Sequence, residues 1–121
     1  MSRSLSTLKD QLRLGLILID EAITELADQD RADDIAALIT ARLRFEPSDV
    51  SDILLAGPEA PTALLCKAAG VKLNGFSAIL RMRHRRGLET GEPAAQLRAY
   101  QRDLESAGLV QRIEPTGRRT N

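Results

Sequence analysis

Apolar residues recur along the chain at spacings of three, four and seven, which is the period of an amphipathic α-helix. Polar stretches, or stretches with Gly or Pro, separate these apolar runs and are typical of helix ends. The pattern therefore predicts about six helices joined by short turns. We expect them at about residues 5–27, 32–44, 47–56, 61–69, 74–86 and 93–108.

The first predicted helix is the least regular of the six. Leu8, Leu12, Ile19, Ile23 and Leu26 form its apolar face, and Ser4 or Ser6 is suited to cap its beginning. Gly15 lies inside it, so we expect either a kink or a break into two shorter helices.

Residues 14–19 are apolar except for Gly15, so a helix there would be apolar around most of its circumference. Such a helix is buried on more than one side, which predicts a possible homodimer through residues 5–27. The run is too short for a membrane span, which needs about 20 apolar residues.

The other helix ends have recognisable signals. Asp30 is a candidate cap for the second helix and Asn74 for the fifth, and Pro93 opens the sixth. Gly108 is expected to end the sixth helix, after which the chain turns polar. We therefore expect one domain over residues 1–110 and a flexible tail over 111–121.

Composition supports the same all-α fold class. Aromatic residues make up only 2% of the chain, and its apolar residues are mainly Leu, Ile and Ala, which favour helices over strands. Short helices with short turns are typical of stacked helical pairs, as in a HEAT-like α-solenoid fragment, or of a compact helical bundle. Both architectures remain open at this stage.

Charge and cysteine content exclude several classes of protein. The 17 basic and 17 acidic residues balance, so the chain lacks the overall basic excess of many nucleic-acid-binding proteins. Cys66 is the single cysteine, which excludes an internal disulfide and a multi-cysteine metal site. It lies among apolar residues, where a buried small side chain is expected. A lone thiol fits the cytoplasm.

Catalytic motifs are missing from the sequence. His84 is the single histidine, and the glycines form no phosphate-binding motif. Acidic neighbours such as Asp20–Glu21 and Asp33–Asp34 are explained by helix caps and solvated faces. We therefore expect a non-enzymatic protein without a metal or another cofactor, with an unrecognised carboxylate site as the remaining enzymatic alternative.

A basic run near the end of the fifth helix is the first candidate for function. The run contains Arg81, Arg83, Arg85 and Arg86. Two lysines, Lys67 and Lys72, lie nearby in sequence and belong to the same candidate set. Their side chains can bind phosphates, an acidic partner or anionic lipid, or they can simply complement the negative end of the helix dipole. We expect the edge formed with residues 42–45 to contact a partner, and Phe45 to be either a core residue or an exposed anchor.

Residues 62–86 also resemble a helix-turn-helix motif. A short helix ends at Gly70, and a second helix carrying Phe76 and Ile79 follows. In such motifs the early polar residues of the second helix read bases, and basic residues hold phosphates. The residues placed to read bases would be Lys72, Asn74 and Ser77. The residues placed to bind phosphates would be Arg81, Arg85 and Arg86.

The same region resembles the DUF2336 family of helical proteins from alphaproteobacteria. The residues that carry the resemblance are the apolar runs 35–39, 50–55 and 63–71, with Phe76–Leu80 as the next helix. It covers about residues 32–86. The resemblance implies stacked helical pairs and a protein-interaction role, and it implies no catalytic or binding residue.

Together these observations favour a non-enzymatic helical module that binds another protein, of which a regulatory adaptor is one form. The alternative is a small DNA-binding regulator that uses residues 62–86.

Overall fold

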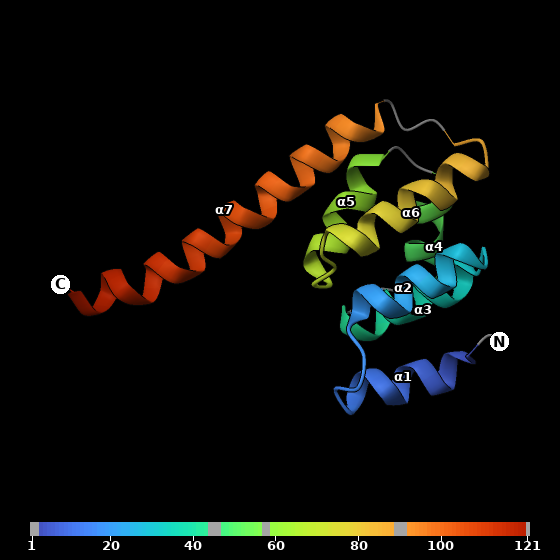
Figure 1. The fold of residues 1–121 in the computed structure, drawn as a ribbon, viewed down its shortest axis with the longest axis horizontal. Helices are drawn as coiled ribbons and strands as arrows, with labels where there is room; N and C mark the ends of the chain where they lie inside the picture. The colour runs from blue at the N-terminus through green and yellow to red at the C-terminus, as the bar shows by residue number, and fades with distance from the viewer. Residues whose placement is uncertain (1–2, 44–46, 57–58, 89–91, 121) are drawn as a thin grey trace.

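The computed structural model describes residues 3–43, 47–56, 59–88 and 92–120, the last stretch by its backbone alone from residue 107 onwards. These residues form helices and no strand, so the predicted all-α fold class is confirmed (Figure 1). The helices are α1 (Leu5–Arg13), α2 (Ile19–Asp28), α3 (Ala32–Arg42), α4 (Pro47–Ala56), α5 (Glu59–Ala68), α6 (Leu73–Arg85) and α7 (Pro93–Thr120).

The first predicted helix is two helices, because the chain breaks at Gly15. Its φ of +76° is a left-handed conformation that glycine adopts without strain. The Gly15 and Leu16 amides donate to the carbonyls of Leu12 and Gln11, at 3.1 and 2.9 Å. This is the Schellman pattern that ends a helix. The side chain of Ser4 caps the beginning of α1, as predicted.

Asp30 does not cap α3, contrary to the prediction. It adopts a φ of +58° one residue past the cap of α2. The amide of Arg31 donates back to the carbonyl of Leu26, at 2.8 Å. Asp is among the few residues that tolerate this left-handed conformation, so Asp30 ends one helix and leaves its side chain free to accept bonds from elsewhere.

The core lies between α2, α3 and α6, and α1, α4, α5 and α7 close it. Leu8 of α1 is fully buried, as are residues from four other helices, Ile23, Ile39, Leu54 and Phe76. The apolar positions predicted from the helical period thus point inward. Cys66 is buried, as its apolar neighbours predicted.

Helices α2 and α6 run parallel, and hydrogen bonds join them at both ends. At the first end, Asp20 of α2 accepts the backbone amides of Lys72 and Gly75 at 2.7 and 2.6 Å. The carboxylate thus caps the positive end of the α6 dipole from another helix. The cap residue of α6 is Lys72 and not Asn74, so that prediction is wrong.

Arg83 of α6 is buried and joins α6 to the end of α4. Its Nη1 donates to the carbonyl of Leu54 at 2.6 Å, and the hydroxyl of Thr62 donates to the carbonyl of Ile53 at 3.1 Å. The last carbonyls of a helix lack partners within it. Arg83 and Thr62 supply those partners, which fixes the ends of α4, α5 and α6 together.

Helix α7 packs on the body by its first half and then projects away from it (Figure 1). Tyr100 anchors it, because its ring stacks on Phe76 at 4.0 Å and its hydroxyl donates to the carbonyl of Val71 at 2.6 Å. The helix continues to Thr120, past Gly108, where its end was predicted. An isolated Gly costs a helix only about 1 kcal/mol, so it need not end one. The flexibility expected for residues 111–121 stays a prediction.

Candidate functional site

The arginines of the basic run contact the adjacent end of α2. Arg85 donates to the carbonyl of Ala27, in the last turn of α2. Arg86 donates to the carboxylate of Asp30 at 2.8 Å. These contacts place cations at the negative end of the α2 dipole, so the two arginines stabilise the folded structure.

The other two arginines of the run are also engaged within the chain. Arg81 lies 3.7 Å from the carboxylate of Asp28 and donates to the hydroxyl of Ser77 at 3.0 Å. Arg83 is buried against α4, as described above. His84 is exposed beside them. The basic run therefore meets acidic groups and carbonyls of its own chain.

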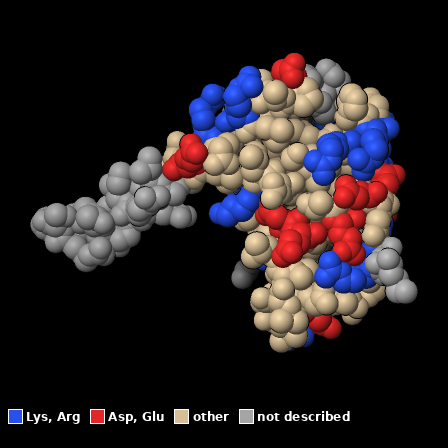
Figure 2. All heavy atoms as spheres, in the orientation of Figure 1, with Lys and Arg blue, Asp and Glu red and all other residues tan. Residues whose placement is uncertain are grey.

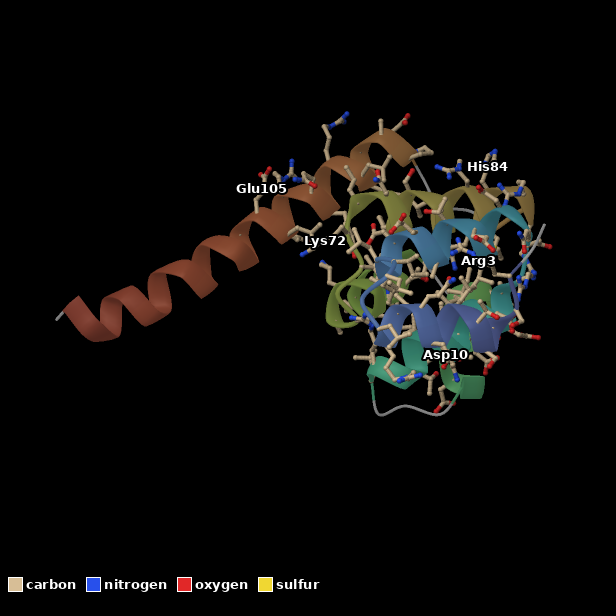
Figure 3. The ribbon with its side chains drawn as sticks, turned by 60° about the horizontal axis from the view of Figure 1, so that its bottom comes forward. Arg3, Asp10, Lys72, His84 and Glu105 are labelled. Atoms are coloured by element: carbon tan, nitrogen blue, oxygen red, sulfur yellow. The ribbon has the colours of Figure 1, made fainter. Side chains whose placement is uncertain are left out.

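The two lysines lie apart from the arginines. Lys67 forms an ion pair with Asp103 of α7 at 2.7 Å, and its ammonium lies 5.8 Å from the centre of the Tyr100 ring. Lys72 is exposed at the beginning of α6, whereas His84 marks the other end of that helix (Figure 3). The six predicted contact residues do not gather into one site.

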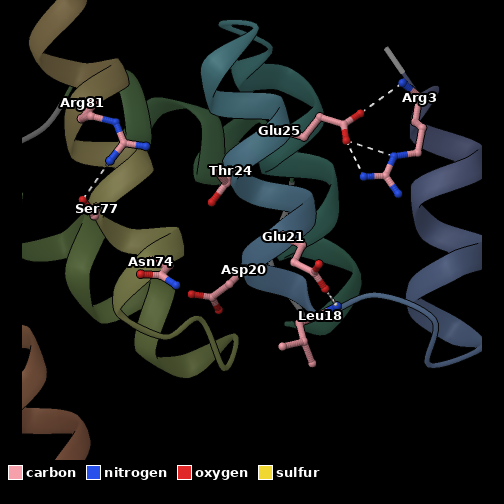
Figure 4. Close-up of a pocket in the computed structure, with 9 residues that line it drawn as sticks. All are labelled: Arg3, Leu18, Asp20, Glu21, Thr24, Glu25, Asn74, Ser77 and Arg81. Carbon is pink, nitrogen blue, oxygen red and sulfur yellow. Dashed lines mark hydrogen bonds and ion pairs between the residues drawn. The ribbon is translucent and has the colours of Figure 1, made fainter. Parts of the chain in front are cut away.

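A polar groove lies between α2 and α6, with Arg3 at one edge (Figure 4). Its volume is about 570 Å³, and its lining residues are Arg3, Leu18, Asp20, Glu21, Thr24, Glu25, Asn74, Ser77 and Arg81. Two of the three residues predicted to read bases, Asn74 and Ser77, thus lie beside carboxylates of α2. Figure 2 shows acidic side chains gathered over α2 on this face. Such charges repel the phosphates of DNA.

Arg3 closes one edge of this groove by pairing with Glu25. Both the backbone amide and the guanidinium of Arg3 donate to the Glu25 carboxylate. These hydrogen bonds, together with the positive charge, lower the pKa of Glu25 below its ordinary value of 4.5. The pair fastens the start of the chain to α2.

The segment between α1 and α2 exposes three large apolar side chains. Leu14, Leu16 and Leu18 are 62%, 68% and 69% exposed, whereas Ile17 packs against the core. We call residues 14–18 the leucine loop. The predicted helix over this segment is absent, and the three leucines are not buried within the chain as expected.

A second apolar feature lies between α5 and α7. A groove of about 480 Å³ is lined by Ala63, Leu64, Lys67, Ala95, Gln96, Ala99, Tyr100 and Asp103. We call it the α5/α7 groove. Leu64 is 65% exposed at this site, and three of the lining residues are small alanines.

The described residues hold no group of three or more His, Cys, Asp or Glu side chains placed to bind a metal ion. Nor does any helix in the described part of the chain have the length and hydropathy to cross a membrane. The prediction for Phe45 lies outside the described residues.

Comparison with known proteins finds no family model, no curated protein and no solved structure that matches this chain. The resemblance to the DUF2336 family therefore stays a prediction.

The leucine loop is the feature that the sequence indicated least clearly. The sequence feature that indicated it was that residues 14–19 are all apolar except for Gly15. The helical period assigned those side chains to a helix buried on several sides. Because Gly15 ends α1, Leu14, Leu16 and Leu18 lie exposed on a connection, whereas Ile19 begins α2 and is buried.

Proposed function

We propose that this chain is a non-enzymatic protein-interaction module that binds a protein partner through the leucine loop. The observation that carries the proposal is the exposure of Leu14, Leu16 and Leu18 on one short connection. Three of the four large apolar side chains that are exposed among the described residues lie there. Exposed apolar side chains that gather in one patch are typical of interaction sites.

The loop is also held in place before any partner binds. The Schellman pattern at Gly15 fixes its beginning. Its end is fixed because the Leu18 amide donates to the Glu21 carboxylate at 2.8 Å and the Ile17 side chain packs on the core. A preformed loop loses little conformational entropy on binding, so its leucines are well suited to contact a partner.

The DNA-binding alternative has less support. Arg81, Arg85 and Arg86 are engaged with the end of α2, so binding phosphate would require them to exchange partners. Two residues expected to read bases face the carboxylates of the polar groove. The interaction module requires no such rearrangement.

A capture experiment tests the proposal. The wild-type chain and the double variant Leu16→Asp/Leu18→Asp serve as baits in native extract, with Ser6→Asp as a control that adds charge at an exposed position of α1. We expect a protein that the wild type and the control retain and the double variant loses. Equal recovery by all three baits would contradict the proposal. Circular dichroism checks that each bait is folded.

A titration with labelled random duplex DNA at two salt concentrations tests the alternative. We expect no binding at low salt. Binding that weakens steeply with salt would instead support the DNA-binding regulator, because that dependence reports phosphate contacts.

A further inference from the structure

We propose that the partner of the leucine loop is a second copy of this chain, which receives the loop in its α5/α7 groove. This inference rests on the proposed function, because it names the partner of the same loop. It predicts a head-to-tail contact, with the loop of one copy seated between α5 and α7 of the next.

The distribution of exposed apolar side chains supports this pairing. Among the described residues, the four large exposed ones divide between two places, three on the leucine loop and the fourth, Leu64, at the α5/α7 groove. The loop protrudes and the groove is recessed. Its small alanines, Ala63, Ala95 and Ala99, leave space for inserted leucine side chains. The two surfaces therefore match in hydropathy, and the groove has room for an inserted side chain.

Charge at the two sites is complementary too. Arg13 directly precedes the leucine loop, and its side chain is 69% exposed although it pairs with the similarly exposed carboxylate of Asp10 at 3.1 Å. Asp103 lies at the groove, and its side chain is 55% exposed despite its pair with Lys67. A loop seated in the groove can bring the guanidinium of one copy to the carboxylate of the next, which favours one orientation.

The positions of the two features require two copies. The leucine loop connects α1 and α2, and the groove lies between α5 and α7, with α3 and α6 in the body between them (Figure 1). One chain cannot seat its own loop. Because the two surfaces differ, a contacting pair still has one free groove on the first copy and one free loop on the second, and the contact is heterologous. Such contacts produce open chains or closed rings.

Sedimentation velocity over a range of protein concentrations tests the inference. We expect the wild type to form species larger than a dimer as concentration rises. Two variants address the two surfaces, Leu16→Asp in the loop and Leu64→Asp in the groove. Each removes an exposed leucine from the contact, and we expect self-association at least tenfold weaker in both. The exposure of both side chains makes the variants compatible with folding, which circular dichroism verifies.

Mixing the two variants gives the sharper result. The Leu16→Asp chain keeps an intact groove, and the Leu64→Asp chain keeps an intact loop. We therefore expect the mixture to form a one-to-one heterodimer that grows no further. A Leu64→Asp chain that still dimerises, with no heterodimer in the mixture, would overturn the inference in favour of a two-fold contact between loops.

A wild type that stays monomeric at all concentrations would also overturn it. The proposed function would survive that result if the capture experiment still returned a different protein that the loop variant loses. If the capture experiment failed as well, both would be wrong.

Discussion

Tyr100 joins three parts of the molecule through one side chain. Its ring stacks on Phe76 of α6, its hydroxyl donates to the carbonyl of Val71, and Lys67 of α5 lies over the ring. Burial raises its pKa well above the ordinary value of 10.0. The folded state thus holds the phenol in its neutral form. This contribution to stability is fully present below pH 10 and decreases as pH rises through that value.

Tyr100 is the single tyrosine of the chain, so its ionisation can be followed without interference. We predict that tyrosinate absorbance stays absent above pH 10 for as long as the helical circular dichroism signal persists, and that it appears together with unfolding. Titration of the folded protein near pH 10 would contradict this. In Tyr100→Phe, the loss of the hydrogen bond is expected to lower the free energy of unfolding by about 1–2 kcal/mol at neutral pH.

Gly75 is required by the close approach of its neighbours and not by its backbone conformation. A Cβ atom at this position would lie 2.6 Å from Cγ1 of Val71 and 3.2 Å from the carboxyl group of Asp20. Glycine thus allows the Asp20 carboxylate to reach the amides at the beginning of α6.

We therefore predict that Gly75→Ala destabilises the protein by about 1–3 kcal/mol. In an ordinary helix interior the same substitution stabilises by up to about 1 kcal/mol, so the sign of the effect is diagnostic. Urea unfolding measures it. A stabilised variant would show that α2 and α6 are further apart than described.

At the scale of elements, the parallel pair α2 and α6 organises the fold. Asp20 holds the beginning of α6, and Arg85 and Arg86 hold the end of α2. Opposite charges thus meet opposite ends of the two helix dipoles. The basic run thus contacts the acidic end of α2, and this contact stabilises the fold.

Replacing Asp20 tests this arrangement. Asp20→Ala leaves two amides of α6 without their acceptor, and we expect a loss of about 1–3 kcal/mol in the free energy of unfolding. Asp28→Ala is the matched control, because its exposed pair with Arg81 is long, and its effect should stay within about 0.5 kcal/mol. Equal effects in urea unfolding would contradict the role of Asp20.

The Arg3–Glu25 pair predicts a dependence of stability on pH. Since the pKa of Glu25 is lowered in the folded state, its contribution is present above about pH 4.5 and is lost as pH falls through the folded value. Glu25→Gln should therefore have a lower Tm than the wild type at neutral pH, with a difference that disappears in acid. Glu105→Gln, on the exposed part of α7, should match the wild type throughout. A constant difference down to acid pH would exclude this ionisation as its cause.

Local sequence predicted those features that depend on neighbours along the chain. The apolar period placed Leu8, Ile23 and Leu26 in the core, because helical spacing alone puts such residues on one face. It did not predict the caps that come from distant helices. Asp20 and Gly75 are 55 residues apart, and no local pattern indicates their contact. The basic run looked like a binding site for the same reason, since its partners are distant in sequence.

At the scale of the whole molecule, internal pairing of the charges leaves an apolar surface as the feature available to a partner. The arginines near the end of α6 contact α2, and Lys67 contacts Asp103. The leucine loop, by contrast, exposes side chains that gain free energy on burial, about 25 cal/mol for each Å² of apolar surface. We therefore expect a partner to bind at the connection between α1 and α2.

Site-specific crosslinking in cells tests whether the leucine loop, and not the basic run, contacts a partner. A photo-activatable residue replaces Leu16 in one variant and His84, which is exposed beside the basic run, in a second. We predict crosslinks to protein from position 16, including a second copy of this chain, and none from position 84. Crosslinks from position 84 alone, to protein or to nucleic acid, would contradict binding through the leucine loop.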